Sequence, residues 1–145
     1  WLSAVWVALE DMTMDNGSLV YVPGSHKMPI FDFYDLKLKC ANFDDQFESY
    51  AEYEEFIRQL VAVGKLETKP LVCKKGQAFI WSANLIHGGD IIRDPNSTRY
   101  SQVTHYYYDD CDVYYSPMFS EAWKGKFAEK DLTNKNIREH KIVKG

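Results

Sequence analysis

Short apolar runs separated by turn residues are the feature that most restricts how this chain can fold. The first run covers residues 1–10, and the Asp-Asn-Gly segment at 15–17 separates it from a second run at 18–22. Asn and Gly both tolerate positive φ, so this spacing predicts two strands joined as a hairpin. Aromatic residues make up 15% of the chain, which favours sheet and a lined cavity over a helical bundle.

Three further strands are expected in the second half of the chain. They cover residues 70–73, 78–81 and 99–108, and a loop rich in Gly, Asp, Asn and Pro lies between the last two, at 82–98. Strands dominate and the turns between them are short. The pattern therefore predicts a mainly β fold, either an antiparallel sandwich or a small barrel.

One long helix is predicted at about residues 44–63. Its apolar side chains recur at steps of three and four residues, its charged side chains occupy the other face, and Gly64 is a natural C-cap. Because strand patterns flank it on both sides, we interpret it as an insertion packed on the outside of a sheet. The increasingly charged tail at 120–145 is expected to be a peripheral helix or a loose end.

Charge and cysteine content argue against several classes of protein. Seventeen Lys and Arg against 21 Asp and Glu give a net charge of −4 without a basic block, which is atypical of a nucleic-acid-binding protein. No apolar run approaches the roughly 20 residues of a membrane-spanning helix. The three cysteines are odd in number and widely spaced, so neither a disulfide framework nor a zinc knuckle is indicated. A reducing, cytoplasmic compartment is expected.

The start of the chain lies inside an apolar pattern, at Trp1, without a polar lead-in. The termini of domains are usually polar and frayed. We therefore interpret the sequence as incomplete at its N-terminus.

A histidine and an arginine are the candidate functional residues. His87 follows an apolar segment and precedes Gly88 and Gly89, and the two glycines clear space beside the imidazole for a metal or a substrate. In a strand, Arg99 and Ser101 point to the same face, where a guanidinium with a neighbouring hydroxyl suits a carboxylate. A loop histidine beside a tight turn and a solvated surface arginine are the simpler alternatives.

Six short segments occur in a specific order along the chain. They are Trp6-Val7-Ala8-Leu9-Glu10-Asp11, Asn16-Gly17-Ser18-Leu19-Val20, Pro23-Gly24-Ser25-His26-Lys27, Lys75-Gly76-Gln77-Ala78, His87-Gly88 and Arg99-Tyr100-Ser101. Together they resemble the phytanoyl-CoA dioxygenase family of non-haem iron(II), 2-oxoglutarate-dependent oxygenases. The resemblance covers roughly residues 1–119 and is specific as an ordered set.

The resemblance implies a double-stranded β-helix, a cupin-like jelly roll, of which residues 1–119 would form the C-terminal part with one inserted helix. It also implies iron(II) held by two histidines and one carboxylate, with 2-oxoglutarate and O2 as the other reactants. His87 would be the distal histidine ligand and therefore the catalytic residue. Arg99 would bind the far carboxylate of 2-oxoglutarate with help from Ser101, and Trp6 would line the cosubstrate pocket.

Two departures from the family pattern restrict what this chain can do alone. The His-x-Asp motif that supplies the other two iron ligands in the family lies upstream of the Trp6 strand, and neither His-x-Asp nor His-x-Glu occurs in the chain. A hydroxyl residue is common two places after the distal histidine, where this chain has Gly89. A single imidazole does not hold iron(II) usefully, so we expect the chain alone to be inactive.

The function expected of the intact protein is hydroxylation of an unidentified small organic substrate. Two alternatives stay open: a halogenase of the same fold, in which Gly or Ala replaces the iron-binding carboxylate, and a metal-free jelly-roll binding module that keeps only the carboxylate pocket. Long loops tend to be functional, so residues 27–43 and the helix after them are the expected lid or substrate-side elements.

Overall fold

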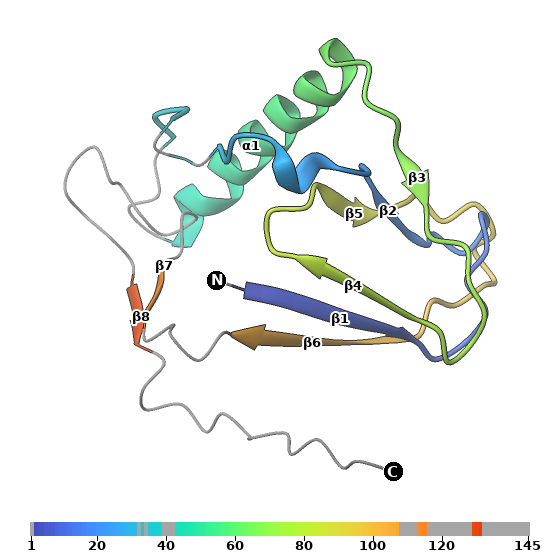
Figure 1. Cartoon of the computed structure of the whole chain (residues 1–145). Helices are drawn as coiled ribbons and strands as arrows, with labels where there is room; N and C mark the ends of the chain where they lie inside the picture. Colours follow the sequence, from blue (N-terminus) through green and yellow to red (C-terminus); the bar gives the residue numbers. More distant parts are fainter. Residues whose placement is uncertain are drawn as a thin grey trace.

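The chain forms two three-stranded antiparallel sheets, one long helix and a separate pair of strands (Figure 1). A computed structural model describes residues 2–31, 33, 35–38, 43–107, 113–115 and 129–131, with the backbone alone described at 43–48, 113–115 and 129–131. The fold of these residues is mainly β, as the sequence predicts. The finer assignment to a jelly roll stays a prediction.

Each sheet combines strands that are distant in the sequence. The first has the order β4-β1-β6, which are the strands Ala78–Ser82, Leu2–Ala8 and Ser101–Tyr107. The second has the order β3-β2-β5, which are the strands Lys69–Pro70, Leu19–Tyr21 and His87–Gly89. All neighbouring strands in both sheets are antiparallel.

The main core lies between the two sheets. Its centre is the buried face of β1, which consists of every second residue, Ala4, Trp6 and Ala8. Two ring contacts join the sheets across this core. The ring centroids of Tyr21 in β2 and Phe79 in β4 are 4.8 Å apart, and those of His87 in β5 and Trp81 in β4 are 4.9 Å apart.

The connection between β1 and β2 is not a hairpin, so the expected pairing of these two strands is wrong. β1 pairs with β4 and β6, whereas β2 pairs with β3 and β5. Residues 9–18 cross from one sheet to the other, and Met12 pairs with Cys73 on the way. The long-range arrangement gives β1 a hydrogen-bonded partner at both edges, where a hairpin would supply a partner at one.

The predicted helix is present as α1 (Phe43–Val63). The helix ends at Val63, directly before the expected cap Gly64, but the left-handed conformation falls on the next residue, Lys65, with φ 49°. Contrary to expectation, the helix does not pack on the outside of a sheet. Its Tyr53 forms a small separate core with Phe33 and Leu38. The preceding segment thus covers part of the apolar face of α1, and a cleft separates the helix from β2 and β5.

Two short strands outside the sheets, β7 (Val113–Tyr115) and β8 (Glu129–Asp131), pair with each other. Because β8 belongs to the charged tail, this part of the tail is neither a helix nor a loose end. The remaining residues of 120–145 lie outside the described part of the chain. Within the described part, no helix has the length and apolar character needed to cross a lipid bilayer.

Candidate functional site

His87 is the first residue of β5, a strand in the middle of the segment that was expected to be a loop. Its side chain is exposed, and its ring packs beside Trp81. The Nδ1 atom lies 2.7 Å from the main-chain oxygen of Leu85. A carbonyl oxygen can only accept, so Nδ1 carries a proton, and in the neutral ring Nε2 then keeps its lone pair. This is the tautomer in which a histidine binds a metal through Nε2.

The guanidinium of Arg99 lies against β5 beside Gly89. A Cβ atom built on Gly89 would be 2.9 Å from Nη1 of Arg99, so the missing side chain is what makes room for the guanidinium. His87 and Gly89 share one face of β5 and are about 6.6 Å apart along the strand. The structure therefore brings Arg99 to the same face of β5 as His87.

Ser101 and Trp6 lie on the inner face of the first sheet. Ser101 is half-buried at the start of β6, directly opposite Ala8 of β1. Directly opposed residues share a face, so Ser101 lies on the same side of the sheet as Trp6. Trp6 is 4% exposed and belongs to the core with Trp81, which makes it a buried packing residue.

The Pro-Gly-Ser-His segment fixes the residues that precede His87. Ser25 lies in the short 3-10 helix η1 (Ser25–Lys27), is buried, and accepts a hydrogen bond at Oγ from the N–H of Ile86 (2.8 Å). The oxygen of Ile86 accepts a hydrogen bond from the N–H of Val22 (2.9 Å). This explains why the segment is close to the site although His26 itself stays exposed at the surface.

The Asn-Gly segment fixes the residues around Arg99, a role that its interpretation as a hairpin turn missed. Asn16 is 5% exposed, and its Nδ2 donates to the main-chain oxygens of Asp11 and Thr98, each at 3.0 Å. The oxygen of Gly17 accepts a hydrogen bond from Nη1 of Arg99. Gly17 has a φ of 68°, and a Cβ there would be 2.7 Å from a side-chain carbon of the 90–92 segment.

Two acidic residues at the end of the Trp6 segment hold neighbouring turns, and sequence reasoning assigned neither of them a role. Glu10 accepts hydrogen bonds from Thr98 and Tyr100, on either side of Arg99.

Asp11 accepts hydrogen bonds from Nζ of Lys74 (2.8 Å) and from the main-chain N–H of Lys75 (2.9 Å). These two hydrogen bonds lower the pKa of Asp11 below its ordinary value, and the bond from Lys74 has the larger effect. Neither partnership has a local sequence signal, because each joins residues more than 60 positions apart.

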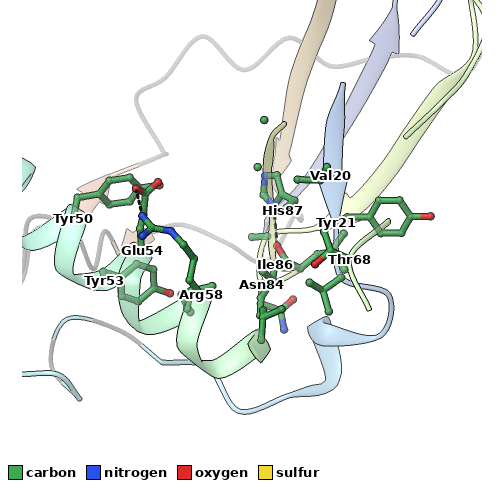
Figure 2. Close-up of a pocket in the computed structure, with 17 residues that line it drawn as sticks. Val20, Tyr21, Tyr50, Tyr53, Glu54, Arg58, Thr68, Asn84, Ile86 and His87 are labelled. Carbon is green, nitrogen blue, oxygen red and sulfur yellow. Dashed lines mark hydrogen bonds and ion pairs between the residues drawn. The ribbon is translucent and has the colours of Figure 1, made fainter. Parts of the chain in front are cut away.

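A cleft of about 630 Å³ separates α1 from β2 and β5 (Figure 2). His87 and Gly88 line it, whereas Arg99, Ser101 and Trp6 do not. A Cβ on Gly88 would meet nothing within 4 Å, so the cleft is open at this point of β5.

The helical wall of the cleft carries an aromatic group and an ion pair network. Figure 2 shows Tyr50 and Arg58 of α1 on the side opposite His87. Arg58 pairs with Glu54 (3.6 Å) and Glu55 (2.6 Å). Partial burial, followed by the negative charge of Glu54, raises the pKa of Tyr50.

The described residues do not form a metal site on their own. No group of three or more His, Cys, Asp or Glu side chains within them is arranged to hold a metal ion. His87 offers one nitrogen in the appropriate tautomer, and iron(II) needs several preorganised ligands. Any iron bound at His87 would therefore depend on ligands outside the described residues.

The sequence model of the phytanoyl-CoA dioxygenase family matches residues 2–98 of the chain. The chain belongs to the phytanoyl-CoA dioxygenase family. This confirms the resemblance seen in the sequence, and the family is one of dioxygenases. The matched residues include Trp6 and His87 and end immediately before Arg99, so the family match does not reach the Arg-Tyr-Ser segment.

The chain is also similar to one curated protein over a longer stretch than the family model covers. The phytanoyl-CoA dioxygenase domain-containing protein 1 homolog of Dictyostelium discoideum is 29% identical over 114 residues. The alignment covers 77% of this chain and 37% of the relative, so the chain spans little more than a third of the relative's length. No solved structure matches the chain significantly.

Proposed function

We propose that the protein carrying this chain is an Fe(II)- and 2-oxoglutarate-dependent dioxygenase that hydroxylates a small organic substrate. The observation that carries the proposal is the position of Arg99, whose guanidinium lies against Gly89, two residues along the same strand from His87. A cation for a carboxylate and a metal-binding imidazole on one face of a strand suit a dicarboxylic cosubstrate that must also reach a metal. Membership of the phytanoyl-CoA dioxygenase family supports the same chemistry.

The proposal includes the jelly-roll assignment. Two antiparallel sheets face each other across one core, and each is assembled from strands distant in the sequence. Both features are typical of double-stranded β-helix folds. Residues 1–119 would be one part of that domain, with α1 as an insertion between β2 and β3.

In this proposal His87 binds iron through Nε2, and the hydrogen bond from Nδ1 to Leu85 holds the ring in the required tautomer. The other ligands would come from elsewhere in the protein, since the described residues do not provide them. The oxygen chemistry would belong to the iron, and the contribution of this chain is the geometry of binding. We expect the chain alone to be inactive for this reason.

Arg99 binds the far carboxylate of 2-oxoglutarate in this proposal. A guanidinium has five N–H donors, and the bond from Nη1 to the oxygen of Gly17 uses one of them. The remaining donors allow the two parallel bonds of a guanidinium–carboxylate pair. The hydroxyl of Ser101, at the start of β6 and two residues after Arg99, is a further donor, and Trp6 packs in the core on the same face of the sheet as Ser101.

The test is the formation of succinate by the natural full-length protein, measured with and without Fe(II) and 2-oxoglutarate. We expect succinate only when both are present, and we expect His87→Ala and Arg99→Ala to abolish it. Gln102→Ala, which removes an exposed side chain from the outer face of β6, is the control and should keep wild-type rates. Wild-type rates in the His87 and Arg99 variants would rule out their roles. A protein without a saturable iron site would instead be a metal-free binding module.

A further inference from the structure

We infer that Glu10 is the residue that positions Arg99 for carboxylate binding. The inference rests on the proposed function in one respect, namely that the ligand of Arg99 is 2-oxoglutarate. Glu10 does not touch that ligand site. It acts on the backbone and side chain of the two residues that flank Arg99.

The carboxylate of Glu10 holds both neighbours of Arg99 at once. Its Oε2 accepts a hydrogen bond from the hydroxyl of Thr98 (2.7 Å), and its Oε1 accepts one from the main-chain N–H of Tyr100 (2.5 Å). Both are charge-assisted bonds, which are shorter and about twice as strong as neutral ones. One side chain thus fixes the chain immediately before and immediately after the arginine.

Two more hydrogen bonds complete the support on each side. The N–H of Leu9 donates to the oxygen of Tyr100 (3.0 Å), which extends the β1–β6 ladder by one residue, and Nδ2 of Asn16 donates to the oxygen of Thr98 (3.0 Å). Each neighbour of Arg99 is therefore held at two atoms. A side chain on a fixed backbone loses less conformational freedom when it binds a ligand, so its affinity is higher.

Glu10 bonds to the neighbours of Arg99, which leaves the positive charge of Arg99 available to a ligand. Glu10 directs its two oxygens at Thr98 and Tyr100 and not at the guanidinium. Among the described residues, Arg58 and Arg93 each have a carboxylate within 4.0 Å. Within the same residues, no carboxylate pairs with Arg99. A guanidinium without a carboxylate partner is free to pair with an incoming one. Glu10 therefore orients the cation without neutralising it.

The experiment compares 2-oxoglutarate binding by the natural full-length protein and its variants, by anaerobic calorimetric titration in the presence of Fe(II). Glu10→Gln keeps one acceptor oxygen and loses the other, together with the charge. We expect its affinity for 2-oxoglutarate to fall about tenfold. The KM for 2-oxoglutarate should rise similarly, while kcat at saturating 2-oxoglutarate stays within about twofold of wild type.

A second pair of variants covers the case in which Glu10→Gln does not fold. Thr98→Val removes the hydroxyl donor and keeps the shape of the side chain, whereas Thr98→Ser keeps the donor. We expect Thr98→Val to weaken binding and Thr98→Ser to restore it. Glu67→Gln removes an exposed carboxylate that pairs with Lys69 (3.4 Å) and controls for the change in net charge.

A spectroscopic readout separates a failure of this inference from a failure of the proposed function. We expect the Nε–H resonance of Arg99 in a nitrogen-15 spectrum to shift in Glu10→Gln and Thr98→Val, and to stay in place in Glu67→Gln. An unmoved resonance, or wild-type affinity in Glu10→Gln beside lost binding in Arg99→Ala, would overturn the positioning role. A wild-type protein that binds no 2-oxoglutarate, with the resonance still shifted in Glu10→Gln, would overturn the proposed function and leave the positioning role standing.

Discussion

The segment that carries His87 and the segment that carries Arg99 are held in place by different chemistry. A neutral hydroxyl, that of Ser25, and main-chain hydrogen bonds fix the residues before His87. A buried amide, that of Asn16, and a carboxylate, that of Glu10, fix the residues around Arg99. Both supports join distant parts of the chain, Ser25 to Ile86 over 61 positions and Asn16 to Thr98 over 82, but only the second uses a charged side chain.

Because the supports differ, a mutation can disturb the position of Arg99 without disturbing that of His87. The support of Arg99 depends on a few polar side chains that each make several hydrogen bonds. The support of His87 consists of one side-chain hydroxyl, that of Ser25, and of backbone groups that substitution cannot remove. Changes near Arg99 should therefore have larger effects than matched changes near His87.

The largest difference is expected between Asn16→Ala and Ser25→Ala. Asn16→Ala removes a buried amide that bonds to Asp11, Thr13 and Thr98, and should lower the free energy of unfolding by about 3 kcal/mol. Ser25→Ala leaves the single N–H of Ile86 without its partner and should cost about 1.5 kcal/mol. Urea unfolding measures both.

An exposed asparagine provides the control for this comparison. Asn96→Ala should change the free energy of unfolding by less than about 0.5 kcal/mol, since the side chain lies at the surface. Equal losses in Asn16→Ala and Ser25→Ala would contradict the unequal division of support between the two segments.

A smaller effect, on binding and not on folding, is expected at the two glycines of β5. The Cβ of Gly89→Ala would meet the end of the flexible Arg99 side chain at 2.9 Å, so the guanidinium must move and 2-oxoglutarate should bind about tenfold more weakly. Gly88→Ala places its Cβ where nothing lies within 4 Å and should bind normally. Titration with 2-oxoglutarate, with melting temperatures to verify folding, distinguishes the two. Identical affinities would show that Arg99 does not need the space at Gly89.

The smallest effect is expected from the exposed pair of Asp11 and Lys74, next to Glu10. The pKa of Asp11 is lower in the folded protein than its ordinary value of 3.8. Its stabilising contribution is therefore fully present above that value and is lost as the pH falls through the lowered pKa. Asp11→Asn should make acid unfolding, followed by circular dichroism, slightly less steep below pH 3.8. An unchanged acid transition would show that the pair has no role in folding stability.

The sequence predicted those parts of the molecule that have a local signal. The apolar runs of β1, β4 and β6 and the periodicity of α1 all appear near the expected residues. The spacing of His87, Arg99 and Ser101 also suggested groups that could act together. The roles of these residues stay predictions until they are tested.

The remaining features depend on contacts between distant segments, for which the sequence has no local signal. The Asn-Gly segment looks like a hairpin turn, yet Asn16 is buried against Thr98. Glu10 looks like an ordinary acidic residue at the end of a strand, yet its two oxygens bind residues that lie 88 and 90 positions further along the chain. β5 consists of one histidine and two glycines, which have little intrinsic preference for a strand, so its pairing with β2 decides its conformation.

That composition has a consequence for how the protein responds to heat. Glycine lowers the cost of opening a strand, and β5 contains two glycines among its three residues. Segments with few packed side chains open locally at free energies well below that of global unfolding. On warming, β5 and the His87 imidazole should therefore detach from β2 while the core around Trp6 is still packed. Loss of function should then precede global unfolding.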